Sequence, residues 1–155
     1  MENDGRHTDY MKMAIEEARR AARMGEVPVG AVLIAHNDDI LVRTHNRTIT
    51  DSDPSAHAEM LAIRQAASRL GNYRLLNTTL YVTVEPCLMC MGAIIHARIQ
   101  TLVFGTRDPK WGAAGSLYNL GEDRRLNHHT EIIEGLLLEE CRDLIQGFFR
   151  ARRPG

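Results

Sequence analysis

The 155-residue sequence has little of several features that mark other classes of protein. It has three cysteines, an odd number, so a framework of paired disulfides is not expected. Its longest strongly apolar stretch, Ala31 to Ala35, is far too short to cross a bilayer. The N-terminal segment MENDGRHTDY is polar and lacks the apolar stretch of a secretory signal. The sequence therefore predicts a cytoplasmic protein that has no membrane partner.

The sequence also lacks a surplus of charge of either sign. A formal net charge of −1 excludes a general basic field, so a local patch would have to hold any nucleic-acid partner. The remaining composition, 44% hydrophobic and 25% charged, is that of an ordinary globular chain. No internal repeat, low-complexity segment or linker divides it. Residues 1–155 are therefore expected to form one domain, a size that is typical of single domains.

Apolar spacing and turn residues predict an α/β fold. Helices are expected at 9–24, 54–70, 86–97 and about 138–152, and strands at 29–35, 40–45, 79–84, 101–105 and around 132–133. After a first hairpin, strands alternate with helices, which favours a three-layer α/β/α sandwich with a central, mixed, five-stranded sheet.

Local signals set the expected ends of two of these helices. Thr8 or Asp9 is expected to cap the first helix, and Asp53 the second, with Pro54 at its first helical position. The expected apolar face of the second helix consists of Met60, Ile63, Ala67 and Leu70.

Two short segments carry residues suited to metal chemistry. Cys87 and Cys90 are three residues apart at an expected helix start, so both sulfurs can face one point. The helix N-terminus favours thiolates over thiols. His57, at another expected helix start, could supply a third ligand. Three protein ligands leave one tetrahedral position open, which is typical of a catalytic zinc ion rather than a structural one.

Glu59 is the candidate proton carrier beside this site. A zinc-bound water has a pKa of roughly 7, so a hydrolytic reaction needs a group that moves its proton to the substrate. Glu59 lies two residues from His57 and is not needed as a ligand. Residues two apart on a straight helix point away from each other, so convergence requires the looser geometry of a first turn.

Plainer interpretations of the cysteine pair remain. Cys87 and Cys90 could be a redox pair, but such a pair needs neither the His-x-Glu segment nor a proline before the first cysteine. They could be half of a structural zinc site, but that site needs a fourth ligand. Cys141, the remaining cysteine, lies on an apolar helix and is more simply a core residue.

The combination of His-x-Glu, about thirty residues, and then Pro-Cys-x-x-Cys resembles the signature of the cytidine and nucleobase deaminase superfamily. Within that superfamily the chain resembles the bacterial tRNA-specific adenosine deaminases. The segments that carry this resemblance are EVPVGAV at 26–32, HN at 45–46, DPSAHAE at 53–59, NYRL at 72–75, LYVTVEPCLMCMGAIIHARI at 80–99, VFG at 103–105 and GAAGSLYNL at 112–120.

The resemblance implies a cytidine-deaminase-like fold, one zinc ion per subunit and a homodimer. It implies hydrolytic deamination of adenosine to inosine at the wobble position of a tRNA anticodon, with arginine tRNA as the expected substrate. A hydroxide on zinc would attack C6 of adenine, and Glu59 would carry protons to N1 and to the leaving amine. His57, Cys87 and Cys90 would be the zinc ligands.

The resemblance also implies residues that contact the substrate. Asn46 matches a position that contacts the target nucleoside, Val29 and Ala31 are expected to wall the base pocket, and Asp108 is expected near the neighbouring ribose. A stacked base cannot enter such a pocket, so the RNA loop must present it flipped out.

The final helix carries an aromatic pair, Phe148 and Phe149, beside arginines that include Arg152. Aromatic rings and guanidinium groups suit bases and phosphates, which makes Phe149 and Arg152 candidates for contact with the anticodon stem-loop. The alternative is that the phenylalanines pack inward and the arginines are merely solvated.

Two other functions compete with the tRNA enzyme. A zinc deaminase of a free base or nucleoside, such as guanine, cytosine or cytidine, would share the metal site but would not need a basic, aromatic C-terminal helix. A scaffold that keeps zinc for folding alone would have no use for Glu59.

Overall fold

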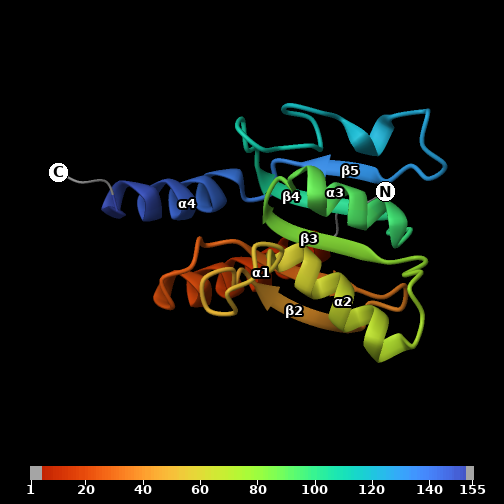
Figure 1. Ribbon diagram of the computed structural model, residues 1–155, viewed down its shortest axis with the longest axis horizontal. Helices are drawn as coiled ribbons and strands as arrows, with labels where there is room; N and C mark the ends of the chain where they lie inside the picture. Colours follow the sequence, from red (N-terminus) through yellow and green to blue (C-terminus); the bar gives the residue numbers. More distant parts are fainter. Residues whose placement is uncertain (1–4, 153–155) are drawn as a thin grey trace.

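The computed structural model describes residues 5–152. Its elements, in chain order, are α1 (Arg6–Arg23), β1 (Gly30–Ile34), β2 (Ile40–His45), α2 (Ala58–Leu70), β3 (Thr79–Val84), α3 (Leu88–His96), β4 (Thr101–Thr106), η1 (Leu120–Glu122), β5 (Glu131–Glu134) and α4 (Leu138–Arg152). Figure 1 shows their arrangement.

The strands form one mixed sheet in the order β2-β1-β3-β4-β5. The β1 strand pairs antiparallel with both β2 and β3, whereas β3, β4 and β5 run parallel to one another. The parallel pairs need crossovers, and α3 supplies the one between β3 and β4. The predicted mixed, five-stranded sheet is confirmed.

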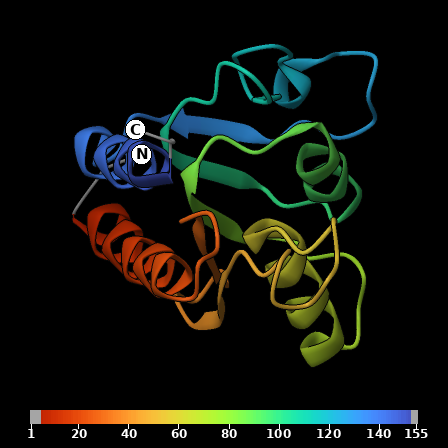
Figure 2. The same ribbon diagram turned by 60° about the vertical axis from the view of Figure 1, so that its left-hand side comes forward.

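Helices cover both faces of the sheet. Figure 2 shows α1 and α4 on one face and α2 and α3 on the other. The two faces of β1 divide accordingly, because successive side chains of a strand point to opposite sides. Ala31 and Leu33 belong to the apolar cluster under α2 and α3, and Val32 and Ile34 to the cluster under α1. The predicted three-layer sandwich is confirmed.

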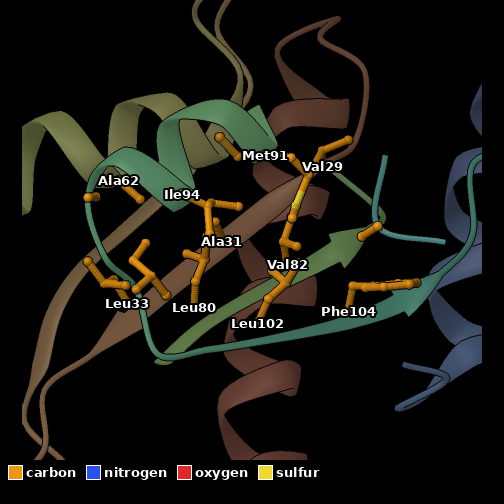
Figure 3. Packing of buried hydrophobic residues seen from close by; sticks show 14 of the residues in the cluster. Val29, Ala31, Leu33, Ala62, Leu80, Val82, Met91, Ile94, Leu102 and Phe104 are labelled. Carbon is orange, nitrogen blue, oxygen red and sulfur yellow. The ribbon is translucent and has the colours of Figure 1, made fainter. Parts of the chain in front are cut away.

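The larger cluster fixes α2 and α3 against the sheet. In Figure 3, Ala62, Met91 and Ile94 from these helices point towards side chains of β1, β3 and β4. Met91 and Ile94 are fully buried. This packing holds the start of α3 at the end of β3.

The first helix begins earlier than the sequence predicted. It starts at Arg6, and Gly5 occupies the N-cap position in a left-handed conformation, with φ of 91°. The backbone N–H of Asp9 donates to the carbonyl of Gly5, so Asp9 is already inside the helix. The predicted cap at Thr8 or Asp9 was therefore wrong. Gly25 does follow the end of the helix with a positive φ.

The second helix begins later than predicted, at Ala58. Asp53 caps a local turn instead, because its Oδ1 accepts hydrogen bonds from the backbone N–H and the hydroxyl of Ser55. The predicted apolar face was right in part: Ile63 and Ala67 pack against the core cluster, but they do not form the centre of the buried face. Ala58, Ala62 and Ala66 are fully buried, whereas Leu70 is 49% exposed. Alanines at every fourth position bring α2 close to the sheet, and its larger side chains lie beside that contact or face solvent.

None of the helices in residues 5–152 combines the length and apolar character that a membrane span needs.

Candidate metal centre and active site

The candidate site lies at one edge of the sheet, where β2, β3 and β4 end and β1 begins. Helices α2 and α3 start at this edge, so their N-termini point towards it. Helix N-termini carry partial positive charge and unpaired N–H groups, which favour thiolates and carboxylates.

Three side chains converge there. The Nδ1 atom of His57 lies 3.7 Å from Sγ of Cys87 and 3.5 Å from Sγ of Cys90. These three atoms all lie within 4.8 Å of one another. His57 is the N-cap residue of α2 and Cys87 that of α3, and both have extended backbone. The structure thus brings together the three predicted ligands.

The donor set fits zinc. A tetrahedral zinc ion, with bonds of about 2.3 Å to sulfur and about 2.0 Å to imidazole nitrogen, spaces its ligand atoms about 3.5–3.8 Å apart. The His57–Cys87 and His57–Cys90 distances already match that spacing. Within the described residues, this is the group of His, Cys, Asp and Glu side chains that could hold an ion. The three ligands leave a coordination position for water or substrate.

Without a bound metal, the pKa values of the two thiols are shifted in opposite directions. A hydrogen bond from the Cys90 thiol, and then His57, lower the pKa of Cys87 to about 4. The same contact with Cys87, together with burial, raises the pKa of Cys90. The contact with Cys87 also raises the pKa of His57. Zinc binding requires both thiolates and a neutral imidazole, so it releases protons from this cluster.

Glu59 lies beside the ligands and is nearly inaccessible, at 3% exposure. Burial raises the pKa of Glu59 to about 7 in this metal-free cluster. A nearby cation opposes that rise. A carboxyl group whose pKa lies between its ordinary value and neutrality can both take and give a proton.

Glu59 and His57 can both face the site, although residues two apart on a straight helix point away from each other. His57 lies outside the helix, with φ of −74° and ψ of 152°, so the helical rule for residues two apart does not apply to it. Its imidazole can meet the cysteines while Glu59, in the first turn of α2, remains buried beside them.

Asn46 is held rigidly next to this cluster. It is 8% exposed, and its Oδ1 accepts a hydrogen bond of 2.8 Å from the backbone N–H of Ala58. Thr44 donates from its hydroxyl to the carbonyl of Ala58 at 2.7 Å. The backbone N–H of Asn46 also donates to the carbonyl of Val29. Asn46 therefore joins the start of β1 to the start of α2.

Val29 and Ala31 lie at different depths. Val29 is 8% exposed and directly precedes β1, beside Asn46. Ala31 is fully buried in the sheet, paired with Thr44 on one side and Val82 on the other. Of the two predicted wall residues, Val29 is at the edge of the sheet, and Ala31 is in the layer beneath it.

Asp108 lies in the loop that follows β4. Its Oδ1 accepts hydrogen bonds from the backbone N–H groups of Lys110 and Trp111, which form a tight turn. The loop runs back to the metal cluster, because Gly112 pairs with Cys87 in an isolated antiparallel bridge. Asp108 is thus two residues beyond the end of β4 and at the same edge as the candidate ligands.

The two phenylalanines of α4 differ in exposure, and neither belongs to the buried core. Phe148 is half-buried, and the guanidinium of Arg152 lies 3.6 Å from the centre of its ring. Phe149 is 47% exposed. Helix α4 projects beyond the body of the sheet in Figure 1. Phe149 and Arg152 are therefore on a projecting, solvent-accessible helix and do not line the metal cluster.

Two buried carboxylates that hold loops beside the site were missed at the sequence level. Glu26 is fully buried, and Glu85 is 3% exposed. Each accepts hydrogen bonds from a loop beside the site, Glu26 from residues 48–50 and Glu85 from residues 108–116. One signal could have indicated them. In the segments EVP and EPC, an acidic residue stands within an apolar stretch and just before a proline.

The fold and the three candidate metal ligands, His57, Cys87 and Cys90, define a zinc-dependent deaminase. Residues 4–106 match the family model described as the cytidine and deoxycytidylate deaminase zinc-binding region. The chain belongs to this family, and within it to the tRNA-specific adenosine deaminases, on the similarities that follow.

The chain is 50% identical to the tRNA-specific adenosine deaminase of Haemophilus influenzae over 143 residues, 92% of this chain and 83% of the relative. It is 49% identical to the tRNA-specific adenosine deaminase of Bacillus subtilis over 144 residues, 93% of this chain and 89% of the relative.

Solved structures agree on the fold. A structure from work on A-to-I editing by tRNA:A34 deaminases at the wobble position matches with a TM-score of 0.85 and 41% identity, covering 88% of this chain and 99% of the other. A guanine deaminase from Nitrosomonas europaea matches with a TM-score of 0.79, covering 91% of this chain and 83% of the other. It is 22% identical, so it supports the fold alone. The predicted cytidine-deaminase-like fold is confirmed.

Proposed function

We propose that this protein converts adenosine to inosine at the wobble position of a tRNA anticodon. The reaction consumes one water molecule and releases ammonia, with the C6 amino group replaced by an oxygen. Support comes from the 50% and 49% identity to tRNA-specific adenosine deaminases and from the match to a structure studied for editing of A34. Arginine tRNA is the substrate that we propose first.

One observation carries the chemistry. The ligand atoms of His57, Cys87 and Cys90 lie within 4.8 Å of one another, and the carboxyl group of Glu59 is buried beside them. A redox pair would not need the imidazole, and a structural zinc site would need a fourth protein ligand. Three ligands and a shielded carboxyl group suit hydrolysis.

His57, Cys87 and Cys90 would hold the zinc ion. When bound, zinc lowers the pKa of water in its open position to roughly 7 and so supplies a nucleophile at neutral pH. Glu59 takes a proton from the attacking water and delivers protons to N1 of the base and to the departing amine. Glu59 is buried beside the ligands and is not needed as one of them, so it is free to serve as base and then as acid in one cycle.

Asn46 and the loops around it would receive the flipped-out adenosine. Asn46 is fixed by its bond to Ala58, so its carboxamide is preorganised for contact with the nucleoside. Val29 lies next to it and offers an apolar surface to the base, with Ala31 in the layer behind. Asp108, on the other side of the cluster, is proposed to meet the ribose of the neighbouring nucleotide.

The projecting helix α4 would contact the RNA outside the pocket. Phe149 is exposed for stacking, and Arg150 and Arg152 are exposed for phosphates.

We also propose a homodimer that works in the cytoplasm. Exposed apolar side chains at the start of α3, Leu88 and Met89, support a second copy as partner.

The test offers the zinc-loaded protein an anticodon stem-loop of arginine tRNA that carries adenosine at the wobble position, with inosine measured directly. Free adenosine, cytidine and guanine are run in parallel, together with a stem-loop that has guanosine at the wobble position. We expect inosine from the adenosine stem-loop and no turnover of the others. Turnover of a free compound with none on the stem-loop would contradict the proposal and favour a free-base or nucleoside deaminase.

A further inference from the structure

The loop after β4 is organised around one buried carboxylate, that of Glu85. Its Oε1 accepts a hydrogen bond of 3.0 Å from the backbone N–H of Asp108. Its Oε2 accepts bonds of 2.9 Å from the backbone N–H groups of Ala114 and Ser116. The hydroxyl of Ser116 also donates to Oε1. Four donors from one loop thus surround a side chain that is 3% exposed.

The same contacts attach this loop to a metal ligand. Glu85 lies two residues before Cys87 in the chain. Gly112 pairs with Cys87, and the backbone N–H of Ala113 donates to the carbonyl of Pro86 at 2.8 Å. A Cβ atom on Gly112 would lie 2.3–2.4 Å from the carboxylate atoms of Glu85, so the loop backbone packs directly onto the carboxylate. At Gly112, the loop is therefore held against Glu85 and the metal ligand Cys87.

The outer side of this loop presents side chains to solvent. Trp111 is 69% exposed, Leu117 and Tyr118 are each 54% exposed, and Lys110 is exposed. Residues 112–114, on the inner side, are buried. Aromatic and apolar side chains beside a cation suit the unstacked bases and phosphates of a single-stranded RNA loop.

We propose that Glu85 is a positioning residue for RNA binding. Its carboxylate fixes residues 108–116 beside Cys87, so that Asp108 and the exposed side chains of the loop are preorganised for the nucleotides that flank the target base. This inference rests on the proposed function. Without the carboxylate, these four donors, of which the Ala114 N–H is buried, lose their acceptor and the loop opens. RNA binding must then order the loop again, which weakens binding and leaves the chemical step intact.

The test compares the wild type with Glu85→Gln in the zinc-loaded protein. Glutamine keeps the shape of the side chain but turns an NH₂ group towards N–H donors. We expect KM for the stem-loop to rise about tenfold or more, with kcat changed by less than about threefold, because ordering the loop falls on the binding step. Zinc content should stay equal to that of the wild type. Amide hydrogen exchange in residues 107–118 should accelerate.

Three further variants separate positioning from general stability. Glu17→Gln is the matched control, because Glu17 is also 3% exposed but pairs with Arg20 and Arg43 on the other face. It should lower the melting temperature without changing KM or exchange in the loop. Gly112→Ala, whose Cβ overlaps the carboxylate, should raise KM as Glu85→Gln does. Ser116→Ala removes a single donor and should raise KM less; it replaces Glu85→Gln if that variant does not fold.

Each outcome decides one of the two proposals. If the wild type makes no inosine, the proposed function fails, and hydrogen exchange of residues 107–118 still tests Glu85 by itself. If the wild type is active and Glu85→Gln keeps both KM and loop exchange, the positioning role is wrong. A lower melting temperature with unchanged KM would likewise reduce Glu85 to a structural residue and overturn the proposal.

Discussion

At the scale of single residues, the proposed chemistry depends on the positions just before two helices. His57 and Cys87 are N-cap residues with extended backbone, and Cys90 lies in the first turn of α3. A ligand at an N-cap is held by the helix behind it yet points away from the helix surface. Residues thirty positions apart therefore meet with the spacing of a tetrahedral metal ion. Glu59 completes the group from inside the helix.

Replacement of Glu59 tests this division of roles. We expect Glu59→Gln to keep zinc and fold but to lose inosine formation by roughly 10²–10⁴-fold, the range for removal of a general acid–base group. Single-turnover deamination of the stem-loop measures the rate, and elemental analysis measures the zinc. Deamination at the parental rate would show that Glu59 does not move the protons.

His57→Ala provides the contrast to that variant. It should lose zinc and, with it, thermal stability, because metal binding is coupled to folding. A loss of zinc in Glu59→Gln as well would instead place Glu59 among the metal ligands.

At the scale of elements, loops beside the site are held by buried carboxylates rather than by regular secondary structure. Glu26 accepts bonds of 2.6 Å from both the backbone N–H and the hydroxyl of Thr50, and a bond of 3.2 Å from the backbone N–H of Ile49. It thereby holds the loop between Asn46 and α2. Burial by itself raises the pKa of Glu26, but these hydrogen bonds, with one from Thr48, outweigh burial and lower it below its ordinary value of 4.5.

This lowered pKa predicts how stability depends on pH. A carboxyl group whose pKa is lower in the folded state stabilises the fold above its unfolded pKa, and the contribution is lost as pH falls through the folded pKa. Wild type should therefore exceed Glu26→Gln in stability at pH 7, by on the order of 1–3 kcal/mol for lost acceptors. The difference should shrink below about pH 4.5, where the protonated carboxyl group resembles the amide.

Urea unfolding at several pH values measures that difference. Glu131→Gln, an exposed position on β5, serves as the control and should show a small difference at every pH. A gap between wild type and Glu26→Gln that stays constant from pH 7 to pH 3 would contradict a stabilising ionised carboxylate.

At the scale of the whole molecule, the fold gathers the site and its surroundings at one edge. Strands β2, β3 and β4 end there, α2 and α3 begin there, and α4 projects beyond the sheet (Figure 1). The chain has a net charge of −1, so RNA binding cannot rest on overall charge. It must rest on local cations, of which Arg150 and Arg152 on α4 are exposed examples.

Salt dependence tests this local patch. If Arg152 contacts phosphate, stem-loop affinity should fall steeply as salt rises, and Arg152→Ala should weaken binding and flatten the slope of log affinity against log salt by about 1. Fluorescence anisotropy of a labelled stem-loop measures both. Lys12→Ala is the control, since Lys12 is exposed near the start of α1 and should leave the slope unchanged. Equal slopes for Arg152→Ala and wild type would remove Arg152 from the RNA surface.

Much of the architecture could be predicted because its signals are local. The strands at 40–45 and 79–84 and the helix at 138–152 have the bounds that apolar spacing predicted. Cys87 and Cys90 could be paired from the sequence because three residues separate them at a helix start. The zinc chemistry followed from these side chains and His57, since the donor atoms belong to the residues themselves.

The remaining features depended on contacts between distant segments. Gly5 rather than Thr8 caps α1, and Ala58, Ala62 and Ala66 rather than Met60 and Leu70 face the sheet, because tertiary packing outweighs weak local preferences. The sequence could not predict that Glu26 and Glu85 hold loops in place, because their hydrogen-bond donors lie more than twenty residues away in the chain. The amino-acid sequence by itself determined which atoms can bind a metal and carry a proton. The tertiary structure alone decided which loops surround these atoms, because the buried carboxylates accept hydrogen bonds from backbone groups that are distant in the sequence.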